Sequence, residues 1–153
     1  TIYIYMSRHS TFAWSRAVWH SFHTLAANCK DDPGSIEQIK SIIALFALLL
    51  PCVVCRQHAV SYIKPKQGDI KNKDKLILFL YNFHNSVKKE KKLAISPIEI
   101  LKQYKNKDKT HINKIVNTAV NACRPTLHNG PRQLRYYQRR SQQLLEKMKI
   151  INF

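Results

Sequence analysis

The sequence contains few acidic residues and few glycines. Nine Asp and Glu stand against 26 Lys and Arg among 153 residues, so the formal net charge is +17. Three Gly and six Pro exclude collagen-like or glycine-rich low-complexity architecture, and a hydrophobic fraction of 44% excludes wholesale disorder. A chain of this length is sufficient for one domain with its own core and short for two.

Long hydrophobic runs are also lacking. The longest uncharged stretch, residues 41–55, contains Pro51 and is flanked by Lys40 and Arg56, whereas a membrane-spanning helix needs about 20 predominantly apolar residues. The opening residues TIYIYMSRH lack the basic start and apolar region of a secretory signal peptide. We therefore expect a soluble, very basic protein without a transmembrane segment.

The positive charge is densest toward the end of the chain. Residues 106–153 hold 10 basic and 2 acidic side chains, and residues 1–105 hold 16 and 7. Such density attracts polyanions such as nucleic acid, acidic proteins or anionic membranes. Basic residues on solvated helix faces would need no partner, and charge alone does not separate the two interpretations.

Helical periodicity runs through nearly the whole chain, and strand-like alternation is absent beyond the first few residues. Turn signals stand at residues 31–34, 64–65 and 125–131. We predict helices from Ser10 or Thr11 to Asn28, Ser35 to Leu50, Cys52 to Ile63, Lys73 to Lys89, from Ser96-Pro97 onward, His111 to Ala122, and Gln133 to Lys149. The sequence therefore predicts an all-α fold.

The second predicted helix is apolar on nearly every side of its second half. Nine consecutive nonpolar residues begin at Ile42, which is more apolar surface than a small bundle needs to hide. We expect this helix at the centre of the bundle or at an interface. On this basis we predict a homodimer through the first two helices.

Of the four cysteines, only Cys52 and Cys55 have a spacing with mechanistic meaning. At the N-terminus of a helix, two sulfurs about one turn apart can close a small disulfide. The positive end of the helix dipole, the unpaired N–H groups and the following Arg56 favour a thiolate at the first cysteine. This arrangement indicates redox chemistry.

Other interpretations of this cysteine pair differ in strength. A c-type haem requires His directly after the second cysteine, where Arg56 stands, and a thioredoxin fold requires a βαβ pattern that the sequence lacks. A zinc site could use Cys52, Cys55, His58 and one further His, although a second CxxC and a His pair at finger spacing are missing. Zinc and two buried, inert cysteines both stay open.

Histidine and aromatic residues recur around the cysteines at helical spacing. Trp19 and His23 are four residues apart, and so are His58 and Tyr62. Each alone is typical of a core residue or a solvated imidazole. Three helices that offer such residues around a dithiol predict a flat, polar-edged cofactor pocket, and a flavin is the obvious two-electron acceptor.

These elements stand in the order of the Erv/ALR family of FAD-linked sulfhydryl oxidases, which the sequence resembles over residues 10–105. Its first-helix flavin motif is similar to Arg16-x-x-Trp19-x-x-x-His23, and its redox centre to Pro51-Cys-x-x-Cys with His58. Its fourth-helix signature is similar to Phe83-His84-Asn85-x-Val87. Tyr104 falls where the family commonly has an aromatic residue.

The resemblance implies a four-helix bundle with a short fifth helix that holds FAD non-covalently in residues 10–105. Residues 1–9 then form an N-terminal segment and residues 106–153 a basic helical extension. The substrate dithiol would attack Cys52, and Cys55 would pass electrons through the flavin to O2, giving H2O2. The residues expected to contact the flavin are Arg16, Trp19, His23, His58, Tyr62, His84, Asn85, Val87, Lys88, Lys91 and Tyr104.

Several departures from the family pattern bear on source and partners. Lys88 replaces the usual Asn and could meet the FAD phosphates, and no cysteine lies between residues 56 and 122. Such a compact core resembles the oxidases of large DNA viruses, which implies thiol-containing protein substrates in the host cytoplasm or virion. A cellular member would work in the mitochondrial intermembrane space. Cys29 and Cys123 are either buried thiols or electron relays.

The alternative function is that of a basic, zinc-stabilised helical binding module. Tyr136 and Tyr137 could stack on bases, and the arginines of the last predicted helix fall on neighbouring turns, namely Arg132, Arg135, Arg139 and Arg140. Such a module would contact nucleic acid or another protein. The same region could also be an appendage on an oxidase core.

Overall fold

The computed structural model describes the backbone of residues 2–126 and 129–153, and the side chains of residues 13–126 and 129–153. The α-helices are α1 (Ile2–Asn28), α2 (Pro33–Leu49), α3 (Val53–Ile63), α4 (Lys73–Glu90), α5 (Lys109–Ala122) and α6 (Gly130–Ile150). Two 3-10 helices join them, η1 (Lys64–Asp69) and η2 (Ile98–Tyr104). These described residues contain no strand, so the predicted all-α fold is confirmed.

Helices α1, α2, α5 and α6 start two or more residues before the predicted starts. Helix α1 begins at Ile2, so Ser10 and Thr11 lie inside it, because no Pro or Gly interrupts that stretch. Helix α2 is capped by Asp32 rather than Ser35. The Asp32 carboxylate accepts the N–H of Ser35 at 2.9 Å, and Pro33 occupies the first helical turn, where no N–H is needed.

The segment after α4 also differs from the prediction. Pro97 precedes a 3-10 helix rather than an α-helix, and no side chain caps its start. Ser96 does not cap it because Ser96 binds side chains of α4 instead. In the predicted break at residues 125–131, Leu127 and His128 lie outside the described residues.

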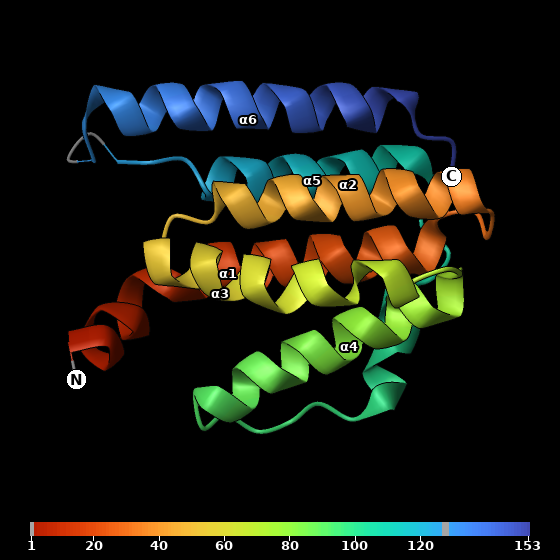
Figure 1. Cartoon of the computed structure of the whole chain (residues 1–153), viewed down its shortest axis with the longest axis horizontal. Helices are drawn as coiled ribbons and strands as arrows, with labels where there is room; N and C mark the ends of the chain where they lie inside the picture. Colours follow the sequence, from red (N-terminus) through yellow and green to blue (C-terminus); the bar gives the residue numbers. More distant parts are fainter. Residues whose placement is uncertain (1, 127–128) are drawn as a thin grey trace.

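The helices form successive layers. Figure 1 shows α6 outermost, α2 and α5 beneath it, then α1 and α3, with α4 lying obliquely on the opposite side. The packing pairs agree with this order: α6 contacts α2, α5 contacts α1, and α1 contacts α4. Helix α3 packs on α2, so the two cysteines stand at the junction of these layers.

One hydrophobic core continues through all these layers. It includes Phe22 and Leu25 of α1, Phe46 of α2 and Leu80 of α4. The last two helices belong to it through side chains that are almost fully buried, namely Ile112, Val116, Ala119, Val120, Leu144 and Met148. Residues 109–150 therefore complete the bundle rather than trail from it.

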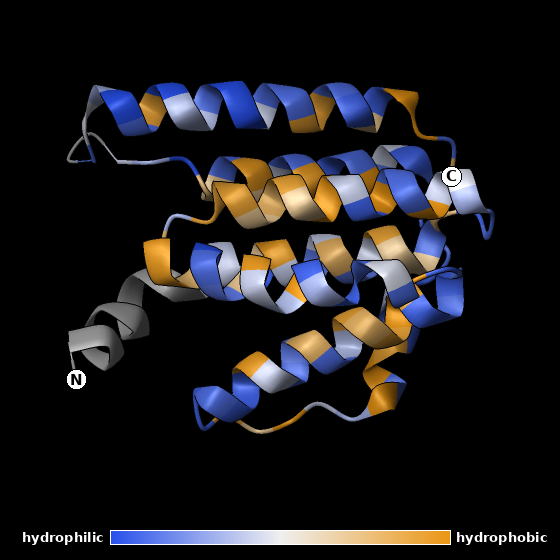
Figure 2. Ribbon diagram, in the orientation of Figure 1, coloured by the Kyte–Doolittle hydropathy of each residue, from blue (hydrophilic) through white to orange (hydrophobic). Residues whose placement is uncertain are grey.

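Helix α6 covers the apolar helix α2. The outward surface of α6 is hydrophilic, whereas α2 beneath it is hydrophobic over much of its length (Figure 2). Tyr137 of α6 is buried and donates its hydroxyl to the carbonyl of Val120 at 2.7 Å. This intramolecular cover removes the reason for predicting a homodimer through the first two helices, and we expect a monomer instead.

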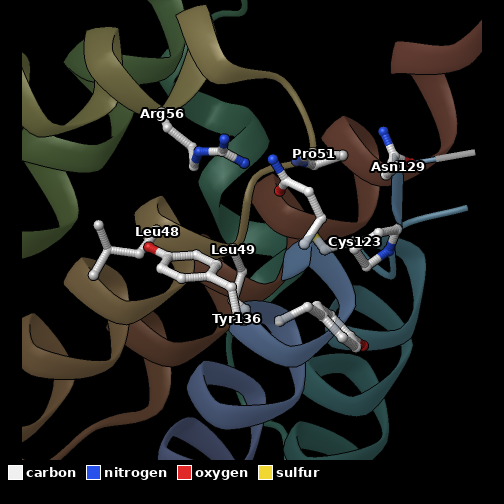
Figure 3. Close-up of a pocket in the computed structure, with 10 residues that line it drawn as sticks. Leu48, Leu49, Pro51, Arg56, Cys123, Asn129 and Tyr136 are labelled. Atoms are coloured by element: carbon white, nitrogen blue, oxygen red, sulfur yellow. The ribbon is translucent and has the colours of Figure 1, made fainter. Parts of the chain in front are cut away.

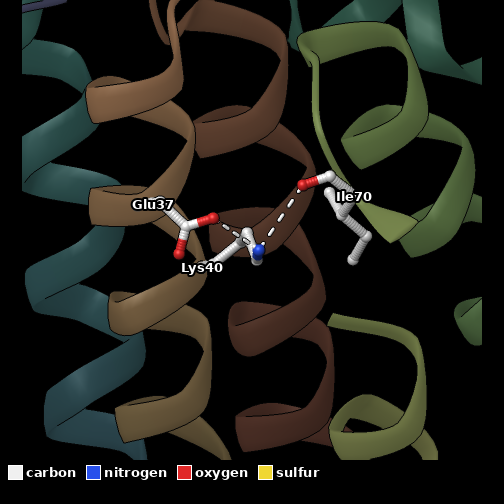
Figure 4. Close-up of polar contacts among 3 residues, drawn as sticks. All are labelled: Glu37, Lys40 and Ile70. Carbon is white, nitrogen blue, oxygen red and sulfur yellow. Dashed lines mark hydrogen bonds and ion pairs between the residues drawn. The ribbon is translucent and has the colours of Figure 1, made fainter. Parts of the chain in front are cut away.

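Polar contacts hold the connections between helices. Lys40 of α2 donates to the Glu37 carboxylate at 2.6 Å and to the carbonyl of Ile70, beyond η1, at 3.4 Å (Figure 4). Asn28 ends α1, donates to the carbonyl of Tyr104 at 2.8 Å and accepts the N–H of Lys107 at 2.9 Å. These contacts fix η1 and η2 against the bundle.

Within the described residues, every helix is too short or too polar to cross a bilayer.

Candidate functional site

The two cysteines occupy the first turn of α3. Cys52 is the N-cap residue, and its Sγ accepts a hydrogen bond from the backbone N–H of Cys55 at 3.2 Å. Pro51 precedes the cap and follows the end of α2, rather than opening α3. Both cysteines are partly exposed. The predicted location of the pair at a helix N-terminus is therefore what the structure shows.

Arg56 fixes the connection that carries this pair. Its Nη1 donates to the carbonyl of Leu50 at 2.7 Å, which ties the first turn of α3 to the end of α2. A hydrogen bond from a charged donor is stronger than a neutral one. The residue that follows the CxxC sequence therefore orients both cysteines as well as adding positive charge.

A cleft with an empty volume of about 700 Å³, open mouth included, lies beside Cys55. Trp14, Val18, Trp19 and Phe22 form its α1 wall. The α3 wall is Cys55, His58 and Ala59, and the α4 wall is Phe83, Val87, Glu90 and Lys91. Ala47 and Leu50 belong to α2 and its C-cap, so four consecutive segments build a mainly apolar and aromatic hollow.

Charged groups stand at one part of this cleft. The Nε2 of His58 lies 3.4 Å from the Oε1 of Glu90, which makes an ion pair whenever the imidazole is protonated. Lys91 lines the same wall and is exposed. The cleft thus combines an apolar interior with ionisable groups from α3 and α4.

Four of the predicted residues form a continuous stack next to the cleft. Trp19 and His84 lie parallel, with ring centroids 4.2 Å apart and an interplanar angle of 5°. His23 continues the stack on His84, and Tyr104 on His23 at 4.9 Å. The structure therefore brings together residues from α1, α4 and η2 that the sequence placed far apart.

The two histidines of the stack share a hydrogen bond. The Nε2 of His23 and the Nδ1 of His84 are 3.0 Å apart, so one ring donates and the other accepts. Burial lowers the pKa of His23 to about 4 and that of His84 to about 3. Burial is the largest cause of both shifts, the charge of nearby Lys88 contributes to each, and both imidazoles are neutral at pH 7.

The pocket does not lie where the sequence predicted it. We expected Trp19, His23 and His84 to wall a pocket between them, but their own rings fill that space at stacking distance. The hollow lies where Trp19 faces α3. Of the predicted residues, Trp19, Cys55, His58, Val87 and Lys91 line it, whereas His23, His84 and Tyr104 form the stack behind Trp19.

Asn85 and Lys88 contact a loop residue instead of the cleft. Asn85 accepts the N–H of Ser96 at 3.1 Å and donates to its carbonyl at 3.2 Å. Lys88 donates to the Ser96 hydroxyl, and Tyr81 to the same carbonyl at 2.9 Å. Three α4 side chains thus hold the chain that leads to η2, which places Tyr104 on the stack.

The remaining predicted residues lie at the margins. Tyr62 stacks on Phe83 at 4.2 Å and 10°, and Lys66 places its ammonium 3.5 Å from the Tyr62 ring centroid. Tyr62 therefore supports the cleft wall from behind. Arg16 is exposed and lies outside the cleft lining.

Sequence reasoning missed Trp14, Val18 and Glu90 as cleft residues. Trp14, Val18 and Phe22 repeat every four residues on α1, which is a recognisable helical face. That signal was available in the sequence. No sequence signal marks Glu90, because its contact with His58 depends on how α3 and α4 pack.

The other two cysteines are buried free thiols. Burial raises the pKa of Cys29 and raises that of Cys123 to about 12. Over the described part of the chain, no group of three or more His, Cys, Asp or Glu side chains is arranged to hold a metal ion. The predicted alternative of a zinc site at Cys52, Cys55 and His58 therefore finds no ligand cluster there.

Comparisons with known proteins agree with this geometry. Residues 16–109 match the family model described as Erv1 / Alr family. A putative FAD-linked sulfhydryl oxidase 096R of Invertebrate iridescent virus 3 is 36% identical over 78 residues, 48% of this chain and 53% of that protein. The FAD-linked sulfhydryl oxidase of African swine fever virus (isolate Tick/Malawi/Lil 20-1/1983) is 33% identical over 78 residues, 50% and 66% of the two chains.

A yeast protein is also similar to this chain, over a smaller share of its own length. The FAD-linked sulfhydryl oxidase ERV2 of Saccharomyces cerevisiae is 34% identical over 74 residues, 47% of this chain and 38% of that protein. The chain thus spans about half to two thirds of the viral relatives it matches. No solved structure matches it significantly. Because the family match at residues 16–109 covers more than half of the sequence and includes the CxxC turn and most of the cleft residues, the chain belongs to the Erv1 / Alr family.

Proposed function

We propose that this protein is an FAD-linked sulfhydryl oxidase that forms disulfides in thiol-containing proteins. The observation that carries the proposal is the position of Cys55, which lines an aromatic cleft one helical turn from Cys52. The names of the viral and yeast relatives support the same activity.

The residues of the cleft fit a flavin. A fused, planar ring system is apolar on its faces, and Trp14, Trp19 and Phe83 offer matching aromatic surface. Lys91 at the wall suits an anionic diphosphate. We infer that the cleft residues hold the ring system and that Trp19, backed by the stack with His84, keeps its wall rigid.

The chemistry of the two cysteines follows from their places on α3. A substrate thiolate attacks the Sγ of Cys52 in the oxidised pair, the Cys52–Cys55 bond breaks, and Cys55 leaves as a thiolate. A second substrate thiolate then attacks the mixed disulfide and releases Cys52. The substrate loses two electrons and two protons, and Cys55 is left beside the cleft. FAD held by the cleft residues would supply the acceptor for this electron pair and its route to O2, with H2O2 as the product.

Three features of α3 prepare Cys52 for this role. Its Sγ accepts the N–H of Cys55, its place as N-cap puts it at the positive end of the helix dipole, and Arg56 adds a cation nearby. These features hold the partly exposed Cys52 sulfur at the start of α3, where a substrate thiolate can reach it. We propose the host cytoplasm or the virion as the place of action, because the relatives include viral proteins.

The absorption spectrum of the purified chain, followed by oxygen consumption with dithiothreitol, tests the proposal. We expect a yellow protein that consumes O2, and at least about a hundredfold loss of turnover in Cys55→Ser with the flavin retained. Cys123→Ala, which removes a cysteine outside the pair, is the matched control and should keep turnover. A chain that cannot be loaded with FAD would contradict the proposal.

A second candidate function is polyanion binding by α6. Arg132, Arg135 and Arg139 are exposed on its outer surface and have no acidic partner among the described residues. Deleting α6 would not test this, because Tyr137 and Leu144 belong to the core. Arg135→Glu with Arg139→Glu should weaken salt-sensitive oligonucleotide binding if this function exists.

A further inference from the structure

A second hollow lies on the other side of the CxxC turn from the aromatic cleft. It is a groove with an empty volume of about 330 Å³, open side included. Figure 3 shows it between Pro51 and Arg56 on one side and Tyr136 on the other, with Cys123 and Asn129 at one end. Three connections therefore meet here: α2 to α3, the end of α5, and the start of α6.

The connection between α2 and α3 separates the two hollows. Leu50 and Cys55 line the cleft, whereas their chain neighbours Leu49, Pro51 and Arg56 line the groove. Consecutive residues on a helix point about 100° apart, which explains why Cys55 and Arg56 face different hollows. Cys52 is one residue from Pro51, or about 3.8 Å between Cα atoms, and it is partly exposed.

The groove has an apolar floor and a polar rim. Leu49, Cys123 and Tyr137 are buried in the floor. Gln133, Asn129 and Tyr136 are exposed at the rim, with 38% of Tyr136 accessible. Hydrogen bonds hold this frame in place, because Arg56 donates to the Leu50 carbonyl and Tyr137 to the Val120 carbonyl. A fixed groove of this kind suits a short stretch of polypeptide.

Both walls of the groove come from stretches without acidic residues. No Asp or Glu occurs in residues 38–68 or in residues 109–145. Arg56 lines the groove and Arg132 adjoins Gln133, and neither has an acidic partner among the described residues. Glu90, the acidic residue paired with α3, lies at the other hollow with His58. The groove is therefore a positively charged surface beside Cys52.

Arginine is also concentrated in the segment that supplies one wall of the groove. Five of the eight arginines of the chain lie in residues 124–140, although the chain has more than twice as many lysines as arginines. Arginine binds carboxylates through paired, planar donors, which gives geometric selectivity as well as charge. This composition favours an anionic partner with carboxylate groups.

We propose that this groove binds the polypeptide that flanks the attacking cysteine of the substrate, and that it selects acidic flanking residues. The proposal rests on the proposed function, because the substrate sulfur bonds to Cys52 as the Cys52–Cys55 bond breaks and Cys55 leaves as a thiolate. The CxxC disulfide is the oxidant in that step. Cys123 takes no part, since it is fully buried in the floor.

The test compares peptides that differ only in the residues beside one cysteine. The probe is a fluorescent peptide with Glu on both sides of that cysteine, and its counterpart carries Lys. With the cysteine replaced by Ser, neither peptide can react, so anisotropy measures binding alone. We expect the full chain to bind the acidic peptide about tenfold more tightly, and Tyr136→Ala to weaken that binding about fivefold.

Gln133→Glu and Gln143→Ala complete the experiment. Gln133→Glu adds a negative charge to the rim and should reduce the preference for the acidic peptide about tenfold. Gln143 is exposed on α6 outside the groove, so Gln143→Ala is the matched control and should change neither value. Equal binding of both peptides, or binding unaffected by Tyr136→Ala, would overturn the proposal.

Turnover with the cysteine-containing peptides separates the groove from the oxidase activity. The ratio of kcat/KM for the acidic peptide to kcat/KM for dithiothreitol should fall about fivefold in Tyr136→Ala. A chain that oxidises neither substrate contradicts the proposed function, while the anisotropy values still decide the groove. A chain that binds a single-stranded oligonucleotide through Tyr136 and ignores the acidic peptide overturns the proposal in favour of nucleic acid.

Discussion

Trp19 has two environments at once. It lines the cleft beside Cys55 and stacks on His84 at 4.2 Å. It also meets Phe22 and Phe83 edge to face, with centroids 5.6 and 5.1 Å away. A ring held on this many sides has little freedom to rotate. Trp19 thus forms part of the cleft wall and separates the cleft from the histidine pair.

The histidine pair predicts how stability depends on pH. Desolvation, and after it nearby positive charge, lowers the pKa of His23 to about 4 and that of His84 to about 3, whereas both titrate near 6.5 in the unfolded chain. Between about pH 6.5 and 4 the unfolded chain binds more protons than the folded one. The contribution of this pair to the free energy of unfolding is therefore fully present above about pH 6.5, and it is lost progressively as the pH falls from 6.5 to 4.

Urea denaturation at pH 7 and pH 5 measures the effect. Each histidine contributes at most about 1.4 kcal/mol per pH unit, and the partial exposure of His84 reduces its share, so we expect a loss of about 2 kcal/mol for the pair. Phe at both positions keeps the stack without titrating and should remove most of this loss. His111→Gln, at an exposed site, should leave it intact. Equal loss in the double variant would contradict the assignment.

At the scale of elements, the two faces of α6 have different roles. Its inner face contributes Leu144 and Met148 to the core, while its outer face is mostly Arg, Gln and Lys. Truncating one side chain on each face distinguishes a core helix from an appendage. Leu144→Ala removes a fully buried side chain and should lower the free energy of unfolding by about 2–5 kcal/mol.

Gln143→Ala is the neighbouring surface control for that variant and should stay within about 0.5 kcal/mol of the parent. Denaturant titrations of both variants give the comparison. If Leu144→Ala changed the free energy of unfolding as little as Gln143→Ala does, the packing of α6 would not contribute to the stability of the bundle. The groove at the start of α6 would then lose its structural basis.

Helical periodicity in the sequence predicted most helices but not their partners. The repeat of Ile112, Val116 and Ala119 identifies an apolar face on α5, yet nothing in that repeat says that the face packs on α1. Caps were missed for a local reason. Asp32 and Ser35 are both good N-cap residues, and Pro33 after Asp32 decides between them.

For the site, sequence reasoning named several residues that the structure brings together, but it could not divide them between the cleft and the stack. Trp19, His23, His84 and Tyr104 do gather, as their spacing and the family pattern predicted. Whether a given ring faces an open cleft or another ring depends on helix crossing geometry, which spacing does not contain. The role of Asn85 and Lys88 in holding Ser96 has the same origin, because Ser96 returns to α4 only through the loop fold.

At the scale of the whole molecule, α5 and α6 connect several properties. They bury the apolar faces of α1 and α2, they supply the densest positive charge, and they form one wall of the groove beside Cys52. A bundle that lacked them would expose α2 and lose the groove together. The basic region is therefore part of the architecture that surrounds the CxxC turn.

This cover leads to a prediction about oligomeric state. Ile42, Ile43 and Phe46 of α2 are buried within one chain, so these side chains offer no apolar surface to a second copy. We expect sedimentation equilibrium at micromolar concentration to give the monomer mass of 17.9 kDa. Exposed aliphatic residues do remain at Leu93, Ile95, Ile98 and Ile100, with 38–58% of each accessible. If a dimer forms and persists in the double variant Ile95→Ser with Ile98→Ser, its interface lies at α1 and α2, which contradicts the intramolecular cover. If the double variant abolishes the dimer, the contact lies beside η2.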